Sequence, residues 1–241
     1  MTDAVVWHDV ECGGYGADLP VWRELAEAVR GSILDLGAGT GRVSLDLAAA
    51  GHDVTALDRD PALLAELGRR AAERGLEVAT VPADARGPTA LRDRFALVIA
   101  PMQLVQIMGG PAGRAALLAT VSASLAPGGA FAAAIADLDD AVPPEDVQAP
   151  LPDVGERGGW VYSSLPLDVR REPGGVAVEW LRQVVSPAGE LAEERHTQRL
   201  DSLAPELLEA EAAAHGLRPE RRIEVGQTSA YIGSMVVVCR R

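Results

Sequence analysis

Three glycines at alternate positions are the residues of this sequence whose spacing most directly indicates ligand binding. Gly37, Gly39 and Gly41 follow the apolar stretch 33–36, and an apolar helical pattern begins directly after them. Glycine lets the backbone turn sharply and leaves no side chain between the backbone and a ligand. A buried strand that runs through such a loop into a helix is the place where α/β proteins hold nucleotide-like ligands, outside the carboxyl ends of their strands.

The exact spacing of the loop separates two classes of cofactor. Dinucleotide sites use Gly-x-Gly-x-x-Gly, whereas here the glycines read Gly-x-Gly-x-Gly, and Asp35 stands two residues before the first. This acid-x-Gly-x-Gly-x-Gly pattern resembles the first motif of class I S-adenosylmethionine-dependent methyltransferases. That cofactor carries a sulfonium and an ammonium and no phosphate, so an acid beside the loop suits it. From the loop alone, a plain tight turn in another α/β domain remains the alternative.

Two further acids follow the next expected strands. Asp58 ends the stretch 53–57, and its carboxylate can accept hydrogen bonds from both hydroxyls of a ribose, a feature that dinucleotide enzymes share. Asp84 follows the stretch 76–81, where the resemblance implies an acid that accepts from the adenine amino group. A dinucleotide enzyme has no need of an acid there, although a loop or capping aspartate is the simpler alternative.

The resemblance extends to the rest of a cofactor site. It implies that Leu63 lies against the adenine ring, with ordinary core packing as the alternative, and that Tyr15 contacts the methionine end of the cofactor or merely packs there. The complete set of cofactor-binding residues expected from it is Tyr15, Asp35, Gly37, Ala38, Gly39, Gly41, Arg42, Asp58, Arg59, Leu63, Asp84, Ala85, Pro101 and Met102.

The residues that would act on a methyl acceptor are less evident. Methyl transfer from a sulfonium is an in-line displacement, and a general base is needed only when the acceptor arrives protonated. Gln103 and Gln106 follow the expected strand 95–100 and should face the site, where they would orient an acceptor, with a position on a helix surface as the alternative for Gln106. His8 and Glu11 lie in a segment that could cover the site. His196 lies on an expected hairpin, and the strand register decides whether it faces the pocket. His8, His196 and Gln103 are therefore weak candidates for catalysis, and no catalytic residue is assigned.

Composition excludes several classes of function. The 241 residues have a net charge of −13, and all 22 basic side chains are arginine, which a GC-rich genome explains. This acidity argues against a large nucleic-acid surface. Two distant cysteines form no metal-binding spacing, and we expect no metal. Neither a signal peptide nor an 18-residue apolar span is evident, so we expect a cytoplasmic protein that does not enter membranes. The expected partner is a small-molecule methyl acceptor, and the protein is expected to be a monomer or a homodimer.

Hydrophobic periodicity and turn residues predict the elements that must position these groups. We expect irregular structure over 1–18, strands over 33–36, 53–57, 76–81, 95–100 and 130–135, a loop or mobile lid over 136–158, short strands over 160–165 and 167–171, a β-hairpin from 176–185 and 191–200, and antiparallel strands over 219–225 and 231–239. Helices are expected at 19–30, 42–50, from Pro61 onward, at 111–125 and at 204–214.

The predicted fold is α/β, a doubly wound Rossmann-like sheet of seven strands with the last strand antiparallel, and an antiparallel β insertion after strand five. One domain covers residues 1–241. It comprises an N-terminal cap segment and helix (1–31), a cofactor-binding core (32–135), a loop and hairpin insertion (136–202) and a terminal helix with two strands (203–241). In the resembling family, such an insertion often covers the acceptor pocket.

The resemblance implies a small-molecule methyltransferase that uses S-adenosylmethionine, gives S-adenosylhomocysteine as its product, and methylates an oxygen or nitrogen atom. The alternatives are a non-catalytic module that binds S-adenosylmethionine and, less favoured by the glycine spacing and Asp84, an NAD-dependent oxidoreductase. A nucleic-acid methyltransferase is opposed by the charge.

Overall fold

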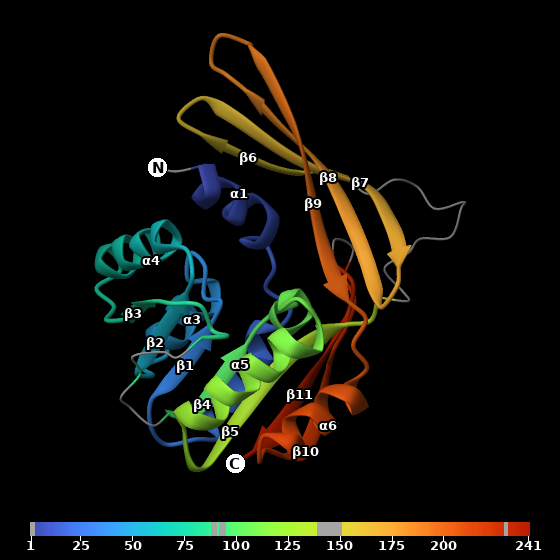
Figure 1. The fold of residues 1–241 in the computed structure, drawn as a ribbon. Coiled ribbons are helices and arrows are strands. Elements are labelled where there is room, and N and C mark those ends of the chain that lie inside the picture. The colour runs from blue at the N-terminus through green and yellow to red at the C-terminus, as the bar shows by residue number, and fades with distance from the viewer. Residues whose placement is uncertain (1–2, 88–90, 92–94, 139–150, 229–230) are drawn as a thin grey trace.

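A computed structural model describes the whole chain except residues 1–2, 88–90, 92–94, 139–150 and 229–230. It contains a sheet of seven strands and a separate sheet of four, which stands over one edge of the first (Figure 1). Within the described ranges, no helix combines the length and the hydropathy that crossing a bilayer requires.

The larger sheet has the order β10-β11-β5-β4-β1-β2-β3. The pairs from β5 through β4, β1 and β2 to β3 are parallel, whereas β11 runs antiparallel to both β5 and β10. The predicted seven-stranded, doubly wound fold is therefore confirmed, including its antiparallel last strand. The strands are β1 (Ile33–Leu36), β2 (Val54–Asp58), β3 (Ala79–Pro82), β4 (Phe95–Ala100), β5 (Leu125–Ala136), β10 (Arg218–Val225) and β11 (Ser234–Arg240).

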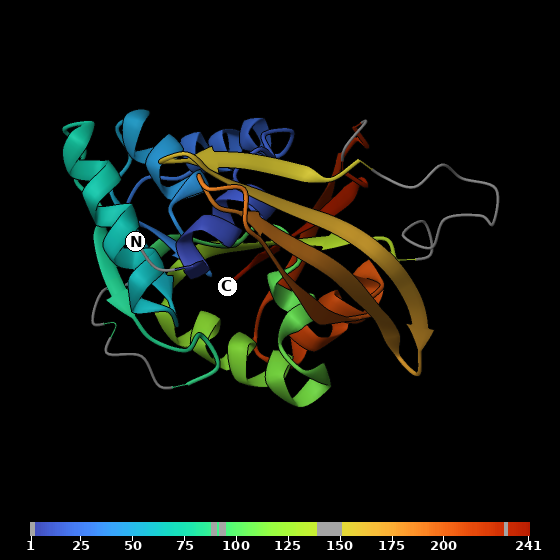
Figure 2. The ribbon, with the colours of Figure 1, turned by 90° about the horizontal axis from the view of Figure 1, so that it is seen from above.

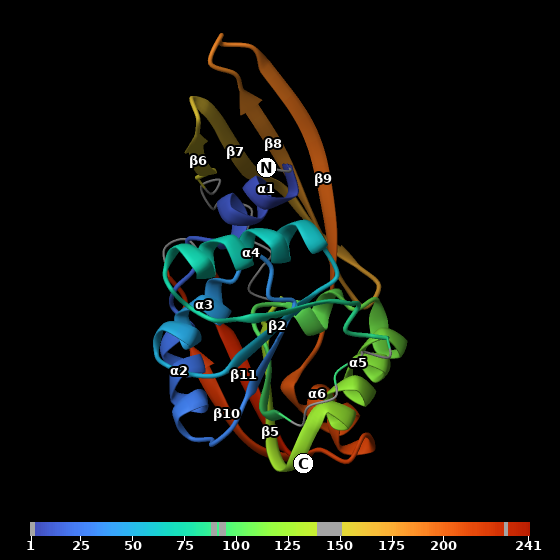
Figure 3. The same cartoon turned by 90° about the vertical axis from the view of Figure 1, so that its left-hand side faces the viewer.

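Helices cover both faces of this sheet, as Figure 3 shows from the side. Helices α2 (Leu19–Glu27) and α3 (Arg42–Ala49) pack on one face through a cluster that includes Trp22, Leu47 and Leu97. Helices α5 (Gly110–Ser124) and α6 (Pro205–Ala214) cover the other face. Helix α4 (Pro61–Glu73) begins at Pro61, as predicted, and its N-cap is Asp60, whose carboxylate accepts from the amide of Ala62 at 2.8 Å. The central strands are apolar because both of their faces are buried.

The insertion is larger than the predicted hairpin. Its four antiparallel strands are β6 (Asp153–Arg157), β7 (Trp160–Glu172), β8 (Gly175–Val185) and β9 (Leu191–Asp201), in that order across the sheet. The hairpin of β8 and β9 is confirmed. Residues 139–150 of the expected loop lie outside the described residues, but the expectation of a loop at β6 is wrong.

A bulge explains why β7 reads as two short strands in the sequence. The pairing with β8 shifts between Pro166 and Asp168, so Leu167 is an extra residue in one continuous strand. One extra residue reverses the alternation of faces, and the period of two is lost at that point.

The N-terminal segment is the largest error in the predicted elements. Residues Asp3–Cys12 form helix α1, and the glycines that suggested a loop begin only at Gly13. Val5, Val6 and Trp7 are three consecutive buried residues. A helix buried on more than one side has no apolar stripe of period 3.6, so the sequence pattern did not reveal it. Figure 1 shows α1 between the insertion and the larger sheet, and Figure 2 shows the same arrangement from above.

Smaller differences concern the ends of strands. Strand β3 begins at Ala79, three residues later than predicted. Strand β5 already begins at Leu125, but its pairing passes from Phe95–Leu125 directly to Leu97–Ala130. Residues 126–129, between the predicted helix and the predicted strand, therefore form an irregularity within the strand, where Gly128 has a φ of 76°.

Candidate functional site

The glycine loop joins β1 to α3 at the carboxyl edge of the sheet. Gly37, Gly39 and Gly41 have φ angles of 66°, 56° and 93°, a region that other residues rarely adopt. The space above the loop is narrow as well. A Cβ atom at Gly37 would lie 2.8 Å from Leu104 Cδ1, and one at Gly39 would lie 2.0 Å from His8 Nε2. Both the backbone conformation and these close approaches therefore require glycine.

Asp58 fastens the tip of β2 to this loop. One carboxylate oxygen accepts from the amide of Gly39 at 2.9 Å, and the other accepts from the amide of Asp60 at 2.9 Å. The side chain is nearly buried. The structure thus brings Asp58 and the glycine loop together, as the sequence predicted, and fixes the direction of the carboxylate.

Asp35 is buried beneath the loop rather than displayed beside it. One oxygen accepts from Ser44 Oγ at 2.6 Å, and the other has no hydrogen-bond partner among the described residues. Burial is the main cause that raises the pKa of this carboxyl group to about 7 from 3.8, against the hydrogen bond from Ser44. A buried acceptor without a partner is costly, and a nearby cationic or N–H donor would stabilise it.

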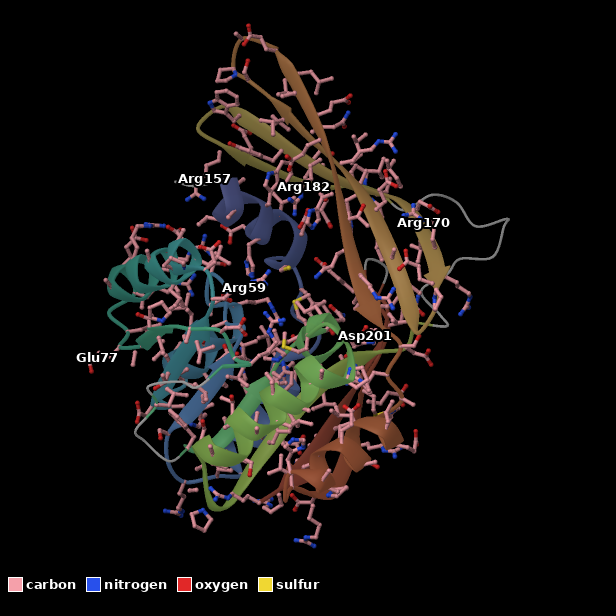
Figure 4. The ribbon with its side chains drawn as sticks, viewed as in Figure 1. Arg59, Glu77, Arg157, Arg170, Arg182 and Asp201 are labelled. Carbon is pink, nitrogen blue, oxygen red and sulfur yellow. The ribbon has the colours of Figure 1, made fainter. Side chains whose placement is uncertain are left out.

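The adenine side of the predicted site is open. The Asp84 carboxylate is half-exposed and pairs with Arg86 at 2.6 Å, which lowers its pKa to about 2. Ala85 is buried directly after it, whereas Leu63 is only half-buried and belongs to none of the core clusters. Arg59 is exposed at the tip of β2 (Figure 4). Leu63 is thus an apolar side chain that the core leaves uncovered, and such a surface is suited to contact with a flat aromatic ring.

Arg42 has a different role from the one that its place after the loop suggests. Its guanidinium donates to both oxygens of Asp18, at 2.5 and 2.8 Å, and to the carbonyl of Tyr15 at 2.9 Å. It also lies over the Tyr15 ring at 5.1 Å from the centroid, and Trp22 Nε1 donates to Asp18 at 2.7 Å. Tyr15 is buried, and burial raises the pKa of its hydroxyl group. This buried network holds the N-terminal segment on the loop, and sequence reasoning missed Asp18 within it.

The segment after β4 lies next to the glycine loop. Leu104 packs on Gly37, and Met102 has a φ of 54°, the single positive φ of a non-glycine residue in the described parts of the chain. Strained conformations of this kind cluster at functional sites. Pro101, Met102 and Gln103 are all half-buried.

Gln106, by contrast, does not face the site. Its amide nitrogen donates to the carbonyls of Ala136 and Asp201 at 3.1 and 3.2 Å, and its amide oxygen accepts from the Ala136 amide at 2.8 Å. The residue is buried and ties the short helix η1 (Leu104–Ile107) to the ends of β5 and β9. The prediction that it orients an acceptor is therefore wrong, because backbone groups occupy both ends of its amide.

Helix α1 lies directly over the glycine loop. His8 Nδ1 is 3.2 Å from Thr40 Oγ1, which donates to Asp9 at 2.8 Å, and Asp9 forms an ion pair with Arg70 of α4. Burial is the largest influence on His8, and it lowers the pKa of the imidazole. His8 is thus placed at the loop, where burial favours the neutral form of its side chain.

The same helix carries the insertion on its other side. Glu11 accepts from Arg182 of β8 at 2.7 and 2.8 Å and from Ser164 of β7 at 2.8 Å, so it is not available as a base. Trp7 lies under the Arg182 guanidinium at 5.1 Å and against the Tyr162 ring at 5.6 Å. Figure 4 shows Arg182 above α1. Sequence reasoning missed Arg182, and no local signal pairs it with Glu11.

The register of β9 decides the direction of His196. His196 pairs with Trp180, two residues from Arg182 along β8, so all three lie on the face of the insertion that covers α1. The His196 and Trp180 rings are 6.0 Å apart, and both side chains are half-buried. His196 therefore faces the body of the protein and not the outer surface.

Comparisons with known proteins agree with this geometry. Residues 33–129 match a family model described as a methyltransferase domain. No curated protein sequence matches the chain.

Solved structures resemble the chain over nearly its whole length. The CcbJ methyltransferase of Streptomyces caelestis is 19% identical with a TM-score of 0.74, and the match covers 99% of this chain and 96% of that one. CalS10 of Micromonospora echinaspora, an amino pentose methyltransferase solved with S-adenosylmethionine, is 22% identical with a TM-score of 0.68 and coverages of 100% and 98%. The glycopeptide N-methyltransferase MtfA, solved with S-adenosylhomocysteine, is 25% identical with a TM-score of 0.63 and coverages of 92% and 86%. The chain therefore has the fold of the S-adenosylmethionine-dependent methyltransferases, and residues 33–129 match the model of a methyltransferase domain.

Proposed function

We propose that the protein transfers a methyl group from S-adenosylmethionine to a nitrogen or oxygen atom of a small molecule. The observation that carries this proposal is the arrangement at the carboxyl edge of the sheet. The glycine loop after β1, Asp58 at the end of β2 and Asp84 after β3 lie at the carboxyl ends of three adjacent parallel strands, in the order that the motif requires. This edge belongs to the segment that matches the methyltransferase domain.

The residues present fit this cofactor. Asp58 would hold the ribose hydroxyls, Asp84 with Ala85 and Leu63 would hold the adenine, and the loop with Tyr15 would hold the methionine part. The partnerless oxygen of Asp35 is an acceptor that suits the positive charge of this part of the cofactor. When bound, S-adenosylmethionine supplies a methyl group that its sulfonium already activates.

The chain's own contribution is then position and exclusion of water. A ligand that contacts the Gly39 backbone needs the space that the His8 ring occupies, so His8 turns away or α1 shifts when the cofactor binds. Because α1 also contacts the insertion, the same movement would shift the face of the insertion that carries Trp180 and His196. If the displaced His8 side chain stays beside the cofactor, its neutral form is suited to take a proton from an amine or hydroxyl acceptor.

The similar structures favour nitrogen as the acceptor atom. MtfA is a glycopeptide N-methyltransferase, and CalS10 is an amino pentose methyltransferase. We therefore place amines before hydroxyl compounds as acceptors.

Calorimetric titration with S-adenosylhomocysteine tests the cofactor assignment. We expect saturable binding, no binding of NAD, and a loss of affinity of roughly tenfold or more in Asp58→Asn, because the charged acceptor is removed. Asp53→Asn is the matched control, since Asp53 is exposed at the other end of the same strand. Absence of S-adenosylhomocysteine binding to the wild type, or binding of NAD instead, would overturn the proposal.

The pH dependence of methyl transfer tests the role of His8. The neutral imidazole is the active form, and burial lowers its pKa from 6.5. The part of the acid limb that is due to His8 should therefore lie below about pH 6.5, the ordinary pKa of histidine, separate from any fall in rate caused by protonation of the acceptor itself. His8→Gln should remove this limb of the profile. An unchanged profile in His8→Gln would exclude His8 as the base.

A further inference from the structure

A cavity of about 530 Å³ lies between helix α1 and β6, the first strand of the insertion. Its volume is in the range of about 300–1,000 Å³ that small-molecule sites span. None of the described lining residues belongs to the set assigned above to the cofactor. The lining includes Val6, Val10, Gly14, Asp153, Tyr162 and Tyr231.

Gly155 allows β6 to approach α1 closely beside this cavity. A Cβ atom at this position would lie 2.9 Å from Val10 Cγ2 of α1, closer than side chains tolerate. Gly155 pairs with Tyr162 of β7, and the Tyr162 ring packs against Trp7 of α1 with 5.6 Å between the ring centroids. Contacts within the protein therefore fix the helix and the strand that form the walls of the cavity.

Asp153 directs its side chain towards α1. It pairs with Ser164 across β6 and β7, and Ser164 Oγ donates to Glu11 of α1 at 2.8 Å. Directly opposed residues of two strands lie on the same face of a sheet, so Asp153 shares the face of Ser164. Its side chain is half-buried and forms neither an ion pair nor a side-chain hydrogen bond with any residue that the structure describes. Burial, and after it the Glu11 carboxylate, raise the pKa of Asp153.

The neighbouring guanidinium groups are already engaged by other carboxylates. Arg157, the single arginine among the described lining residues, lies 3.8 Å from carboxylate oxygens of both Asp9 and Glu66. Arg182 donates to both oxygens of Glu11, at 2.7 and 2.8 Å. Figure 4 shows both arginines beside α1. Neither of them compensates the carboxylate that β6 directs into the cavity.

The hydroxyl group of Tyr231 lies near the same carboxylate. A Cβ atom at Gly14, in the cavity wall, would lie 3.4 Å from Tyr231 Oη. Burial and then the Asp153 carboxylate raise the pKa of Tyr231. Its ring packs on Tyr15 with 4.8 Å between the centroids, whereas its hydroxyl forms no hydrogen bond within the described ranges of the chain. A carboxylate and a hydroxyl group that lack protein partners therefore line one cavity.

We propose that the cavity between α1 and β6 is a ligand site for an organic amine with an apolar body. The ammonium group donates hydrogen bonds to the Asp153 carboxylate and to the Tyr231 hydroxyl oxygen, and a bond between two charged groups is stronger than a neutral one. The apolar body packs against Val6, Val10 and the Tyr162 ring. A carboxylate or phosphate in the ligand would instead place a like charge beside Asp153.

Helix α1 separates this site from the proposed donor site. Val6 and Val10 are four residues apart, so they share one side of the helix and line the cavity. His8 lies between them in sequence, projects from another side and contacts Thr40 of the glycine loop. The inference thus concerns a second ligand, and it does not depend on the proposed methyl transfer or on binding of S-adenosylhomocysteine.

Three probes of similar shape and different charge test the inference: 2-phenylethylamine, 2-phenylethanol and 3-phenylpropanoate. Each is titrated at low salt against the isotope-labelled full-length protein, and the shifts of the amide NMR signals give its dissociation constant. We expect the amine to bind at least about fivefold more tightly than the alcohol, and the acid to bind most weakly. Added salt should reduce the preference for the amine. Equal binding of the three probes, or tighter binding of the acid, would overturn the inference.

The amide signals that shift also locate the amine within the molecule. We expect shifts at Val6, Val10 and Gly14 and over residues 153–156, and none in the glycine loop at 37–41. Shifts confined to the glycine loop or to residues 101–108 would place the amine at the proposed reaction site and contradict the inference.

Two variants and a control test the named groups, and the amide spectrum of each shows whether it is folded. Asp153→Asn keeps the shape of the site and removes its charge, so the preference for the amine over the alcohol should fall below about twofold. Asp168→Asn makes the same change on the exposed outer face of β7 and should keep the preference. Gly14→Leu fills the cavity from an exposed position and should abolish amine binding. An unchanged preference in Asp153→Asn would overturn the inference, and so would amine binding that survives Gly14→Leu.

Discussion

The larger sheet and the insertion sheet are stabilised in different ways. Every residue of β1 is buried, and so are Leu97, Val98, Ile99 and Ala100 of β4. In the insertion, most side chains are half-buried or exposed, and ion pairs such as Glu179–Arg195 and Glu172–Arg199 join its strands. Burial of apolar area is the main stabilising contribution in proteins, whereas exposed ion pairs contribute about 0–1 kcal/mol each.

This difference indicates separate roles for the two sheets. The larger sheet fixes the glycine loop and the acids of β2 and β3, so its part of the site is built before any ligand arrives. The insertion is fixed mainly through α1 and through a small apolar cluster of Ala136, Leu138, Val176 and Leu200 at its base. We infer that the insertion can shift relative to the larger sheet with α1 as its link, which suits a cover that opens for substrates.

Among the substitutions compared in the two regions, those that break an ion pair should differ most in their effect on the free energy of unfolding. Asp18→Asn leaves the buried Arg42 guanidinium with a neutral partner, and we expect a loss of about 3–5 kcal/mol in the free energy of unfolding. Asp168→Asn makes the same change in the exposed pair with Arg170 of the insertion, where water screens the charges, and should cost much less. Urea denaturation of both variants measures the difference. Equal losses would show that burial of an ion pair does not determine its contribution to the free energy of unfolding.

Apolar truncations give the next contrast. Leu97→Ala in β4 removes a fully buried side chain, for which we expect a loss of about 2–5 kcal/mol. Leu191→Ala in β9 removes a side chain that is 57% exposed and should change the free energy of unfolding by less than about 0.5 kcal/mol. A large loss in Leu191→Ala, measured by urea denaturation, would reveal that this face of the insertion is covered in solution.

The pH dependence of stability isolates a single group of the larger sheet. The pKa of Asp35 is about 7 in the folded protein, above its ordinary value of 3.8. Between these values the unfolded chain has released a proton that the folded protein keeps. The contribution of Asp35 to stability therefore falls as the pH rises from about 4 to about 7, by about 1.4 kcal/mol for each unit of pKa shift. Asp35→Asn should lose this dependence and gain stability above pH 7 relative to the wild type. Parallel stability curves of the two proteins would contradict the raised pKa.

The sequence predicted those parts of the site that depend on local spacing. Gly37 to Gly41, Asp58 and Asp84 each follow a strand, and parallel strands bring their carboxyl ends to one edge whatever the details of packing. The approach of His8 to the glycine loop was not predictable. Helix α1 has no apolar stripe, and His8 lies 32 residues before its hydrogen-bond partner Thr40. The bond between Glu11 and Arg182 spans 171 residues and depends on the register of a strand with a bulge.

The ion pair between Glu11 and Arg182 tests the link between the two regions. Glu11→Gln weakens the attachment of α1 to β8, and because the pair is only partly buried we expect a global loss of about 0.5–1.5 kcal/mol. Amide exchange over residues 4–12 should accelerate much more than exchange over β1 or β4, since the core does not depend on α1. Glu179→Gln on the outer face of the same strand is the matched control and should leave the exchange of α1 unchanged.

If α1 serves as the link, Glu11→Gln also changes the affinity for S-adenosylhomocysteine, although Glu11 is turned away from the loop towards Arg182. An unchanged affinity together with accelerated exchange in α1 would show that the insertion and the donor site act independently.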